Sequence, residues 1–309
     1  MTNTIAPIAQ EIQPSTFNTM DMFLASLDVK PRTKETYRKA LNRFMVWIKD
    51  NNIGQPTRTD ILQYKTYLLE NYTACTVSSY LTAVKSLYTY LEAEKISPNI
   101  ANGIKGAKHQ QGFRKDPLTV EQVKNVLAEI DTSSITGKRD YAVINLFVRT
   151  GLRTVEVARA NIEDIRQESG EALLYIQGKG RDSKDDFVLL TEATLRPIRE
   201  YLKLRGETSS TEPLFISHSN KNYGGRLTTR SISRIVKDNL REANIDSERI
   251  TAHSLRHTAV TLSLLAGATI QEAQSMARHK SINTTLIYAH NINRIKQAPE
   301  RKIDNILSM

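Results

Sequence analysis

The sequence is short of cysteine and of long apolar stretches, and each shortage excludes a class of protein. Cys75 is the only cysteine among 309 residues, which excludes an intramolecular disulfide and a thiolate metal cluster and fits a reducing cytoplasm. No stretch approaches the roughly 18 apolar residues that a membrane helix needs. The opening residues MTNTIAPIAQ lack the basic and apolar regions of a signal peptide. We therefore expect a cytoplasmic protein that is neither exported nor anchored in a membrane.

The overall composition indicates a soluble, folded protein with an anionic partner. Hydrophobic residues make up 39% and charged residues 25% of the chain, which is typical of globular proteins. A chain of 309 residues is longer than one core usually supports, so two domains are expected. The formal net charge is +10, which favours nucleic acid or an anionic membrane surface as the partner.

A helical pattern runs from about Phe17 to Lys95. The segments RKALNRFMVWIKD and SSYLTAVKSLYTYLEAEK place apolar residues at helical spacing, and Pro31 and Pro56 precede helix starts. We expect a flexible N-terminus at 1–16 and then about four amphipathic helices at 17–103, joined by short connections as in a small bundle.

Basic residues mark the polar faces of these predicted helices, and two interpretations of them remain open. A run of charge on a helix is commonly a solvated face, whereas a DNA-binding protein would use it to contact phosphates. The candidates for DNA contact are Arg32, Lys34, Arg38, Lys39, Arg43 and Lys85.

The composition of the sequence changes after residue 103. A glycine-containing, Lys- and Gln-rich stretch at 104–116 lacks apolar periodicity and is interpreted as a linker. Thr119 and Gln122 then form a capping-box pattern, with Leu118 and Val123 spaced as a hydrophobic staple. Apolar runs at 173–176 and 187–190 flank a polar turn and predict a β-hairpin. The second domain, 117–309, is thus expected to be mainly α with a small antiparallel sheet.

Four segments of this domain carry polar residues that core packing does not explain. In TGLRTVEV, Gly151 is expected to end a helix, and Arg153 starts the next helix with Glu156 one turn on. An arginine at a helix N-terminus suits a phosphate, although a surface Arg–Glu pair is the alternative. In QGKGRD, Lys179 lies between two glycines at the hairpin turn, where glycines let a backbone approach a ligand closely; a lysine at such a tip is mostly just solubilising, and that interpretation is the alternative.

The other two segments add histidines and a tyrosine. In TAHSLRHTAV, His253 and Arg256 share a helix face and His257 follows. A metal site is disfavoured there, because no carboxylate or cysteine completes a ligand set and the arginine would repel a cation. In RHKSINTTLIYAH, His279 precedes a new helix start and Tyr288 lies about two turns beyond it.

Together these residues match what attack on a phosphodiester requires without a metal. Two guanidinium groups can hold the non-bridging oxygens and offset the charge of the transition state. A tyrosine supplies an oxygen nucleophile, and histidine and lysine can move the protons. Each residue alone is a weak indication of this chemistry, whereas their combination is a specific one.

The order Arg, Lys, His-x-x-Arg, His, Tyr resembles the tyrosine recombinase (phage integrase) family over nearly the whole chain. The matching segments are TGLRTVE, GKG, HSLRHT and RHKSINTTLIYAH. The resemblance implies a helical, SAM-like core-binding domain and a mixed α/β catalytic domain that clamp DNA as a C shape. It also implies a site-specific recombinase that needs no cofactor, metal or ATP. A DNA-binding regulator without catalysis is the alternative.

The resemblance assigns roles to the residues at the matching positions. Tyr288 would be the nucleophile that forms a 3′-phosphotyrosine and frees a 5′-hydroxyl. Arg153 and Arg256 would hold the scissile phosphate, and Lys179 would protonate the leaving 5′-oxygen. His253 would assist loss of the tyrosine proton.

The remaining implied roles support these groups. His279 would hydrogen-bond a phosphate oxygen, Glu156 would orient Arg153, and His257 would be a further support. One departure is Arg278, where the family commonly has glycine; its side chain would either contact DNA or point to solvent.

The implied partners are double-stranded DNA with inverted-repeat sites and further copies of the chain. Near the C-terminus, Ile303, Ile306 and Leu307 form an apolar stripe that packs on its own domain or, as in the family, docks on a neighbour to build a tetramer on two DNA sites. An accessory DNA-bending protein or a heteromeric recombinase partner are further candidates. About 16 residues precede the first predicted helix, so no arm-binding domain is expected. That favours a Xer-like or resolvase-like enzyme or a compact mobile-element integrase.

Overall fold

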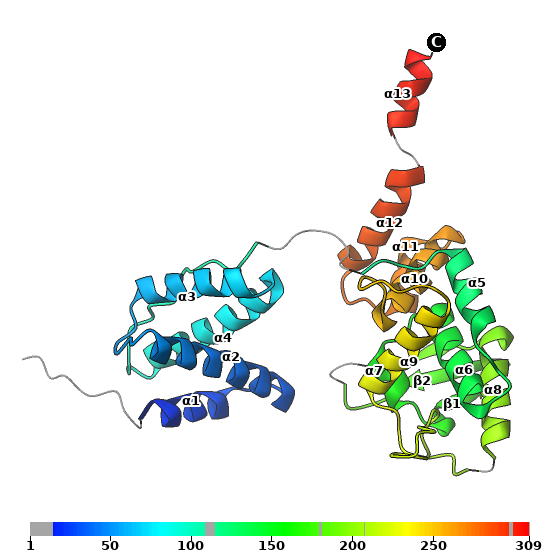
Figure 1. The fold of residues 1–309 in the computed structure, drawn as a ribbon, viewed down its shortest axis with the longest axis horizontal. Helices are drawn as coiled ribbons and strands as arrows, with labels where there is room; N and C mark the ends of the chain where they lie inside the picture. The colour runs from blue at the N-terminus through cyan, green and yellow to red at the C-terminus, as the bar shows by residue number, and fades with distance from the viewer. Residues whose placement is uncertain (1–14, 109–114, 179–180, 207, 297–298, 309) are drawn as a thin grey trace, which may run out of the picture. The chain divides into compact units, whose positions relative to one another are not determined.

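The structure is a computed structural model that describes residues 15–108, 115–178, 181–206, 208–296 and 299–308. The chain divides into two compact units, at 1–111 and 112–309 (Figure 1). No helix among the described residues combines the length and the apolar character that crossing a membrane requires.

The N-terminal unit is a helical bundle. Its described helices are α1 (Ser15–Ser26), α2 (Pro31–Asp50), α3 (Arg58–Asn71) and α4 (Ala74–Ala93). Pro31 occupies the first turn of α2, and Thr57 caps α3 through a capping box with Asp60. Aromatic residues fill the core, where the rings of Phe44 and Tyr64 lie 4.9 Å apart between centroids. The expected helical pattern of this unit is therefore present.

The C-terminal unit places helices around a small sheet. Its first elements are α5 (Val120–Glu129), α6 (Ile135–Thr150), α7 (Thr154–Arg159), the 3₁₀ turn η1 (Ile162–Asp164), β1 (Ile165–Glu168), β2 (Glu171–Ile176), β3 (Asp186–Leu189) and α8 (Glu192–Arg205). Then follow α9 (Thr229–Glu242), α10 (Ala252–Leu265), α11 (Ile270–Ala277), α12 (Ile282–Lys296) and α13 (Pro299–Leu307).

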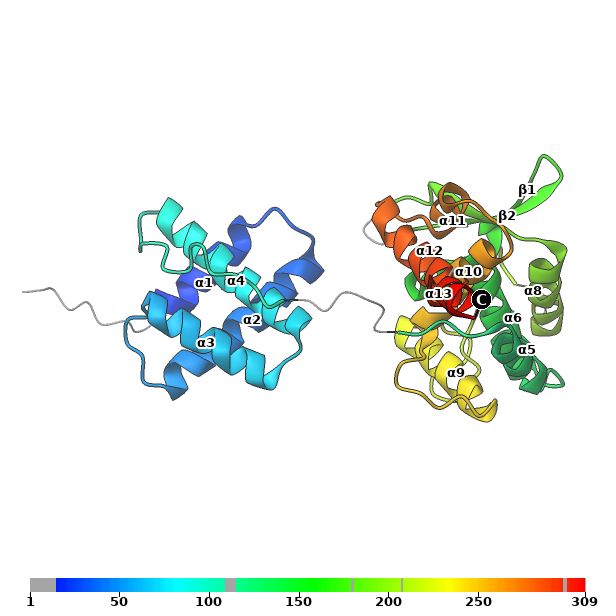
Figure 2. The same ribbon diagram turned by 90° about the horizontal axis from the view of Figure 1, so that it is seen from above.

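The apolar helix α6 forms the centre of this unit and packs against α8 and α10. The sheet lies at the periphery of the helices and has the antiparallel order β1-β2-β3 (Figure 2). The predicted hairpin corresponds to β2 and β3, with Leu174 opposite Val188. A third strand, β1, was not predicted. Its sequence IRQE has one apolar residue and a mostly exposed burial pattern, so it carries no alternation signal.

Local capping signals are confirmed at the start of the unit. Thr119 caps α5, and the side chain of Gln122 accepts a hydrogen bond from the Thr119 backbone N–H at 2.9 Å. Leu118 is buried, and Val123 packs against the same core. The mainly α fold with a small antiparallel sheet is thus confirmed.

Candidate active site

Two helix ends position the arginines of the site. Gly151 ends α6 in a left-handed conformation at φ 62°, a position where a side chain would be strained. The turn presents Arg153 at the N-cap of α7, and the buried Glu156 accepts hydrogen bonds from the Arg153 backbone N–H at 2.7 Å and from Nη1 at 2.8 Å. The Arg153 side chain remains 31% exposed. The expected Arg153–Glu156 pair is therefore an ion pair with a buried carboxylate.

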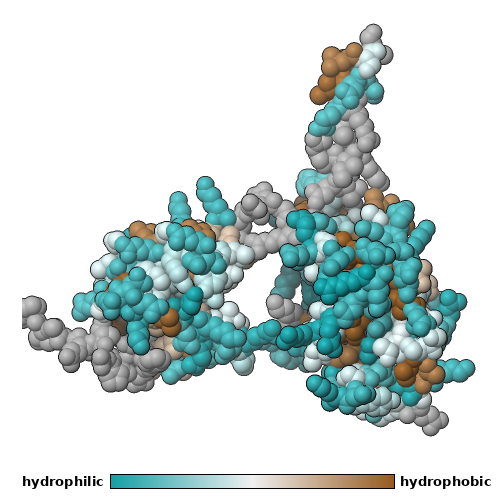
Figure 3. Space-filling model, in the orientation of Figure 1, coloured by the Kyte–Doolittle hydropathy of each residue, from teal (hydrophilic) through white to brown (hydrophobic). Residues whose placement is uncertain are grey.

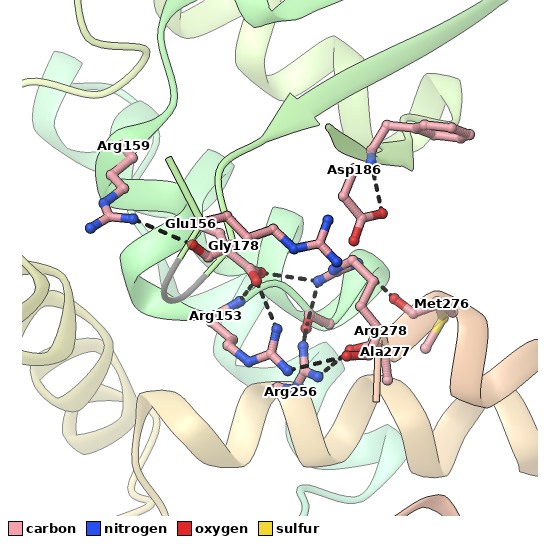
Figure 4. A network of polar contacts seen from close by, with 12 residues as sticks. Arg153, Glu156, Arg159, Gly178, Asp186, Arg256, Met276, Ala277 and Arg278 are labelled. Atoms are coloured by element: carbon pink, nitrogen blue, oxygen red, sulfur yellow. Dashed lines mark hydrogen bonds and ion pairs between the residues drawn. The ribbon is translucent and has the colours of Figure 1, made fainter. Parts of the chain in front are cut away.

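Arg256 projects from the second turn of α10 into the interior. Its guanidinium donates to the carbonyl oxygens of Gly151 and Ala277, so it joins the end of α6 to the end of α11 (Figure 4). Burial lowers the pKa of Arg256 to about 10, and the nearby charges of Arg153 and Arg278 add to the effect. Several positive groups are thus concentrated in a small volume, which favours an anion.

Tyr288, on α12, is buried with its ring between apolar residues and the histidines. It packs with Val260 and Ala277, and only 3% of its surface is exposed. Burial raises the pKa of Tyr288 to about 12, and Arg256 opposes part of that rise. The phenol is therefore protonated at neutral pH, and it could act as a nucleophile only with a base to take its proton.

His257 is the imidazole that the structure brings to this phenol. Its Nδ1 and the Tyr288 hydroxyl form a short hydrogen bond. Burial lowers the pKa of His257 to about 4, with further lowering by His253 and Arg256. The ring is neutral at physiological pH and can accept the hydroxyl proton. Sequence reasoning gave His257 only a supporting role, because helical spacing does not reveal which of two neighbouring histidines faces a residue on another helix.

The ring of His253 packs on the ring of His257. The two ring centroids are 4.5 Å apart in a T-shaped arrangement. Burial, followed by the charges of Arg256 and Arg153, lowers the pKa of His253. The structure thus brings His253 into the cluster, in contact with the histidine that touches Tyr288.

His279 follows α11 and is fixed by its neighbours. Its Nδ1 lies 2.9 Å from Oγ1 of the buried Thr285, and its ring stacks at 6.1 Å on Tyr288. Burial lowers the pKa of His279 to about 4, with Arg256 the next cause. Thr285 was missed from the sequence, although its position one turn before Tyr288 on the same helix is compatible with this contact.

Arg278 does not extend to solvent. Its side chain is 9% exposed and turns inward, where Nη2 lies 3.0 Å from Oε2 of Glu156 (Figure 4). Both alternatives offered for this residue, a DNA contact and a solvent-facing side chain, differ from the observed contact with a carboxylate inside the site.

The remaining predicted residues are Lys179, which lies outside the described residues, and the basic residues of the N-terminal unit. Arg38 pairs with Asp21 at 2.7 Å, and Arg43 donates to the hydroxyl of Tyr67 at 2.6 Å. Lys34 donates to a backbone carbonyl, Lys39 lies 3.8 Å from Glu35, Arg32 is exposed and Lys85 is half-buried.

Comparison with known proteins gives the chain its family. Residues 117–294 match the phage integrase family, and residues 17–97 match the N-terminal SAM-like domain of phage integrases. The tyrosine recombinase XerC of Pelobacter propionicus is 30% identical over 85% of this chain and 86% of its own length. XerC of Caldanaerobacter subterraneus is 33% identical over 68% of this chain, a match that spans 57% of that relative.

Solved structures show the same fold. The XerH recombinase in a post-cleavage complex superimposes with a TM-score of 0.72 at 24% identity, covering 86% of this chain and 78% of that one. A lambda integrase dimer on a core site gives a TM-score of 0.69 at 18% identity, covering 89% and 94%. The fold and the matched residues define a two-domain recombinase of the integrase class. The chain belongs to the phage integrase family. It is a tyrosine-type site-specific recombinase, and no match supports the alternative of a binding-only regulator.

Proposed function

We propose that this protein cuts and rejoins DNA strands through a covalent bond between Tyr288 and a 3′-phosphate. The observation that carries the proposal is the hydrogen bond between the Tyr288 hydroxyl and Nδ1 of His257, a neutral base, beside buried arginines. This arrangement supplies a nucleophile, a proton acceptor and positive charge at one place.

In the cleavage step, the Tyr288 oxygen bonds to phosphorus as the bond from phosphorus to the 5′-oxygen breaks. The hydroxyl proton passes to Nδ1 of His257, and the leaving 5′-oxygen takes a proton from Lys179, the residue at the family's lysine position. One phosphate ester replaces another, so the reverse attack by a 5′-hydroxyl rejoins a strand without an external energy source. The chemistry calls for no metal or cofactor.

Arg153 and Arg256 hold the scissile phosphate in this proposal. Arg153 is supported in this role by its partly exposed guanidinium, which Glu156 fixes on one side. His279 donates to a phosphate oxygen through Nε2, because Nδ1 is engaged with Thr285. His253 supports His257 through their T-shaped contact.

The DNA-binding role extends to the N-terminal unit. Residues 17–103 serve as a core-binding domain, 104–116 as a linker and 117–309 as the catalytic domain, and both domains contact the duplex. The formal charge of +10 and the exposed Arg32 and Lys39 support contact between helix α2 and DNA phosphates. The related structures are DNA complexes of XerH and lambda integrase, which agrees with double-stranded DNA as substrate.

Assembly on DNA uses the C-terminal helix. Ile303, Ile306 and Leu307 on α13 are 54%, 72% and 79% exposed, and they form an apolar surface at the tip of this helix (Figure 3). Burial of such a stripe against another copy would link recombinases into a tetramer that joins two inverted-repeat sites. The named relatives are Xer recombinases, which favours a Xer-like role over that of an element integrase.

The test is trapping of the covalent intermediate. A binding site is first selected from a random duplex library and rebuilt as a nicked suicide substrate, from which the cleaved end diffuses away. In EDTA, the parent protein should form an adduct that resists denaturant, and Tyr288→Phe should form none while binding the same duplex. An adduct that persists in the variant, or a parent that binds but never reacts, would overturn the proposal.

A further inference from the structure

Arg278 lies in a backbone conformation that suits glycine. At the end of α11 it has φ +53°, and the N–H groups of Arg278 and His279 donate to the carbonyls of Ser275 and Gln274. This is a Schellman motif, whose left-handed position normally holds glycine because a Cβ atom costs about 1 kcal/mol there. The position that departs from the family's usual glycine is therefore a strained one.

The side chain carries a second cost. The Nε atom of Arg278 is buried and, within the described residues, has no hydrogen-bond partner. Burial also lowers the pKa of its guanidinium, with Glu156 opposing the effect. A residue that combines backbone strain with an unpaired buried donor calls for a compensating role.

The compensating contacts are all within the active site. Nη2 lies 3.0 Å from Oε2 of Glu156, and Nη1 donates to the Met276 carbonyl at 2.7 Å (Figure 4). Glu156 is the fully buried carboxylate that also receives Arg153. Arg278 therefore joins the first turn of α7, which has Arg153 as its N-cap, to the α11–α12 turn, which carries His279.

We propose that Arg278 is a positioning residue that fixes Glu156 from the side opposite Arg153 and so holds Arg153 in register with His279 and Tyr288. Without Arg278, the buried carboxylate of Glu156 would keep its ion pair with Arg153 alone and would draw that guanidinium away from the phosphate. This inference rests on the proposed phosphotyrosine chemistry, because it concerns the placement of a phosphate-binding group for that reaction.

The deciding variant is Arg278→Gly, which removes the guanidinium while giving the backbone the residue it favours. In single-turnover cleavage of the suicide substrate, its rate should fall roughly 10- to 100-fold, as expected from a misplaced reacting group. The dissociation constant for DNA should stay within about threefold, since the Arg278 side chain is only 9% exposed and turns toward Glu156. Guanidinium ion at millimolar concentration should restore part of the rate, and Arg278→Lys should lie between the two.

Asn244→Gly is the matched control. Asn244 ends α9 in the same way, at φ 60°, with Asn244 and Ile245 donating to Arg241 and Leu240, and it is exposed. This substitution relieves the same backbone strain outside the site and should leave the cleavage rate unchanged. An Arg278→Gly variant that cleaves within twofold of the parent would overturn the inference. The inference would also be overturned if the cleavage rate of Arg278→Gly fell together with its melting temperature and guanidinium ion failed to restore the rate.

A readout independent of cleavage separates this inference from the proposed function. The ¹⁵N–H resonance of the Arg153 side chain, assigned by its disappearance in Arg153→Lys, should be sharp in the parent and broadened or shifted in Arg278→Gly. If the parent forms no adduct, the phosphotyrosine chemistry is wrong, and this resonance still decides the positioning role. An unchanged resonance with normal adduct formation rejects the positioning role alone.

Discussion

The hydroxyl of Tyr288 and Nδ1 of His257 are hydrogen-bonded although the two residues are 31 positions apart in the chain. The pKa of the phenol is raised to about 12 and that of the imidazole is lowered to about 4. At neutral pH the phenol therefore keeps its proton, and the imidazole is neutral and can accept one. Burial is the first cause of both shifts. One buried environment thus prepares both partners for proton transfer.

We predict that His257→Ala and His257→Asn slow cleavage by about 100-fold or more, the usual contribution of a general base. Asparagine can still accept a hydrogen bond from the phenol but cannot take its proton, so it separates holding the ring from removing the proton. The measurement is the single-turnover rate of adduct formation. If the asparagine variant cleaved at the parental rate, His257 would only position Tyr288.

The pH dependence of cleavage should differ between these proteins. In the parent, His257 is neutral well above its pKa of about 4, so the rate should be nearly flat from about pH 6 to 9. In either variant the phenol must ionise unaided, and with a pKa of about 12 the rate should rise about tenfold per pH unit. Rates measured on the nicked duplex at constant ionic strength check this. Parallel profiles for parent and variants would contradict it.

Acid should destabilise the catalytic unit through His257 and His279. Both have a pKa near 4 in the folded chain against an ordinary value of 6.5, so the unfolded chain binds protons first as the pH falls. Their stabilisation is complete above about pH 6.5 and is lost between 6.5 and 4. Each ring contributes at most about 3 kcal/mol, reduced by solvent screening because both are partly exposed.

Hydrogen exchange of amides in α10 and α12, measured at pH 7, 5.5 and 4.5, reports this loss of stability in the C-terminal unit. The single tryptophan, Trp47, lies in the N-terminal unit and does not report on it. The double variant of His257→Asn and His279→Asn should flatten the dependence, whereas substitution of the exposed His290 by Asn should leave it unchanged. A steep acid transition that survives in the double variant would assign it to other groups.

Local signals made much of the fold predictable from the sequence. The capping box at Thr119, the helix end at Gly151 and the proline at the start of α2 depend on near neighbours, and all three are present. Strand β1 was not predicted, because its pairing with β2 is tertiary and its residues are mostly exposed.

The sequence predicted which residues to group into a candidate site, but it could not predict the contacts between them. Motif order brought together Arg153, Arg256 and Tyr288 by their chemistry. The contacts of His257 and Arg278 depend on how α10, α11 and α12 pack, and no spacing rule within one helix encodes that. The left-handed backbone at Arg278 had a sequence signal, since glycine is usual there, but the direction of the side chain had none.

Glu156 should be essential to the stability of the catalytic unit. It is fully buried and pairs with both Arg153 and Arg278, so Glu156→Gln leaves two guanidinium groups without a counter-charge. Removal of one partner from a buried ion network costs about 3–5 kcal/mol. The change in the free energy of unfolding is measured by urea titration, with far-ultraviolet circular dichroism as the signal. Glu192→Gln, which breaks an exposed pair with Arg199, is the control and should cost less than about 0.5 kcal/mol. Equal losses would contradict the buried role.

The basic face of α2 should contribute to DNA affinity through its exposed members. Arg32→Ala and Lys39→Ala should each weaken binding and lower the salt-dependence slope of the association constant by about one. Lys49→Ala, in the last turn of the same helix, is the control and should change neither. Titrations by fluorescence anisotropy at several salt concentrations test this. A slope that Arg32→Ala leaves unaltered would remove that residue from the interface.

Arg43 should behave differently from those two residues. Its guanidinium donates to the Tyr67 hydroxyl and lies 5.7 Å from the ring centroids of both Tyr67 and Tyr72, so its charge is already engaged within the unit. Arg43→Ala should therefore lower the melting temperature of the N-terminal unit, which Trp47 fluorescence reports. A reduced salt slope with unchanged stability would instead make Arg43 a phosphate contact.

The C-terminal stripe gives the last prediction. Ile306 is 72% exposed, so Ile306→Asp should leave the melting temperature of the free chain unchanged, since little apolar surface is lost from its core. The same change would place a charge in the centre of a contact between copies. Light scattering of the protein on duplexes with one and with two sites should then show fewer complexes that join two sites. Asn305→Asp adds the same charge beside the stripe and is the control. If Ile306→Asp destabilised the free chain instead, α13 would pack on its own domain and tetramer formation would need another surface.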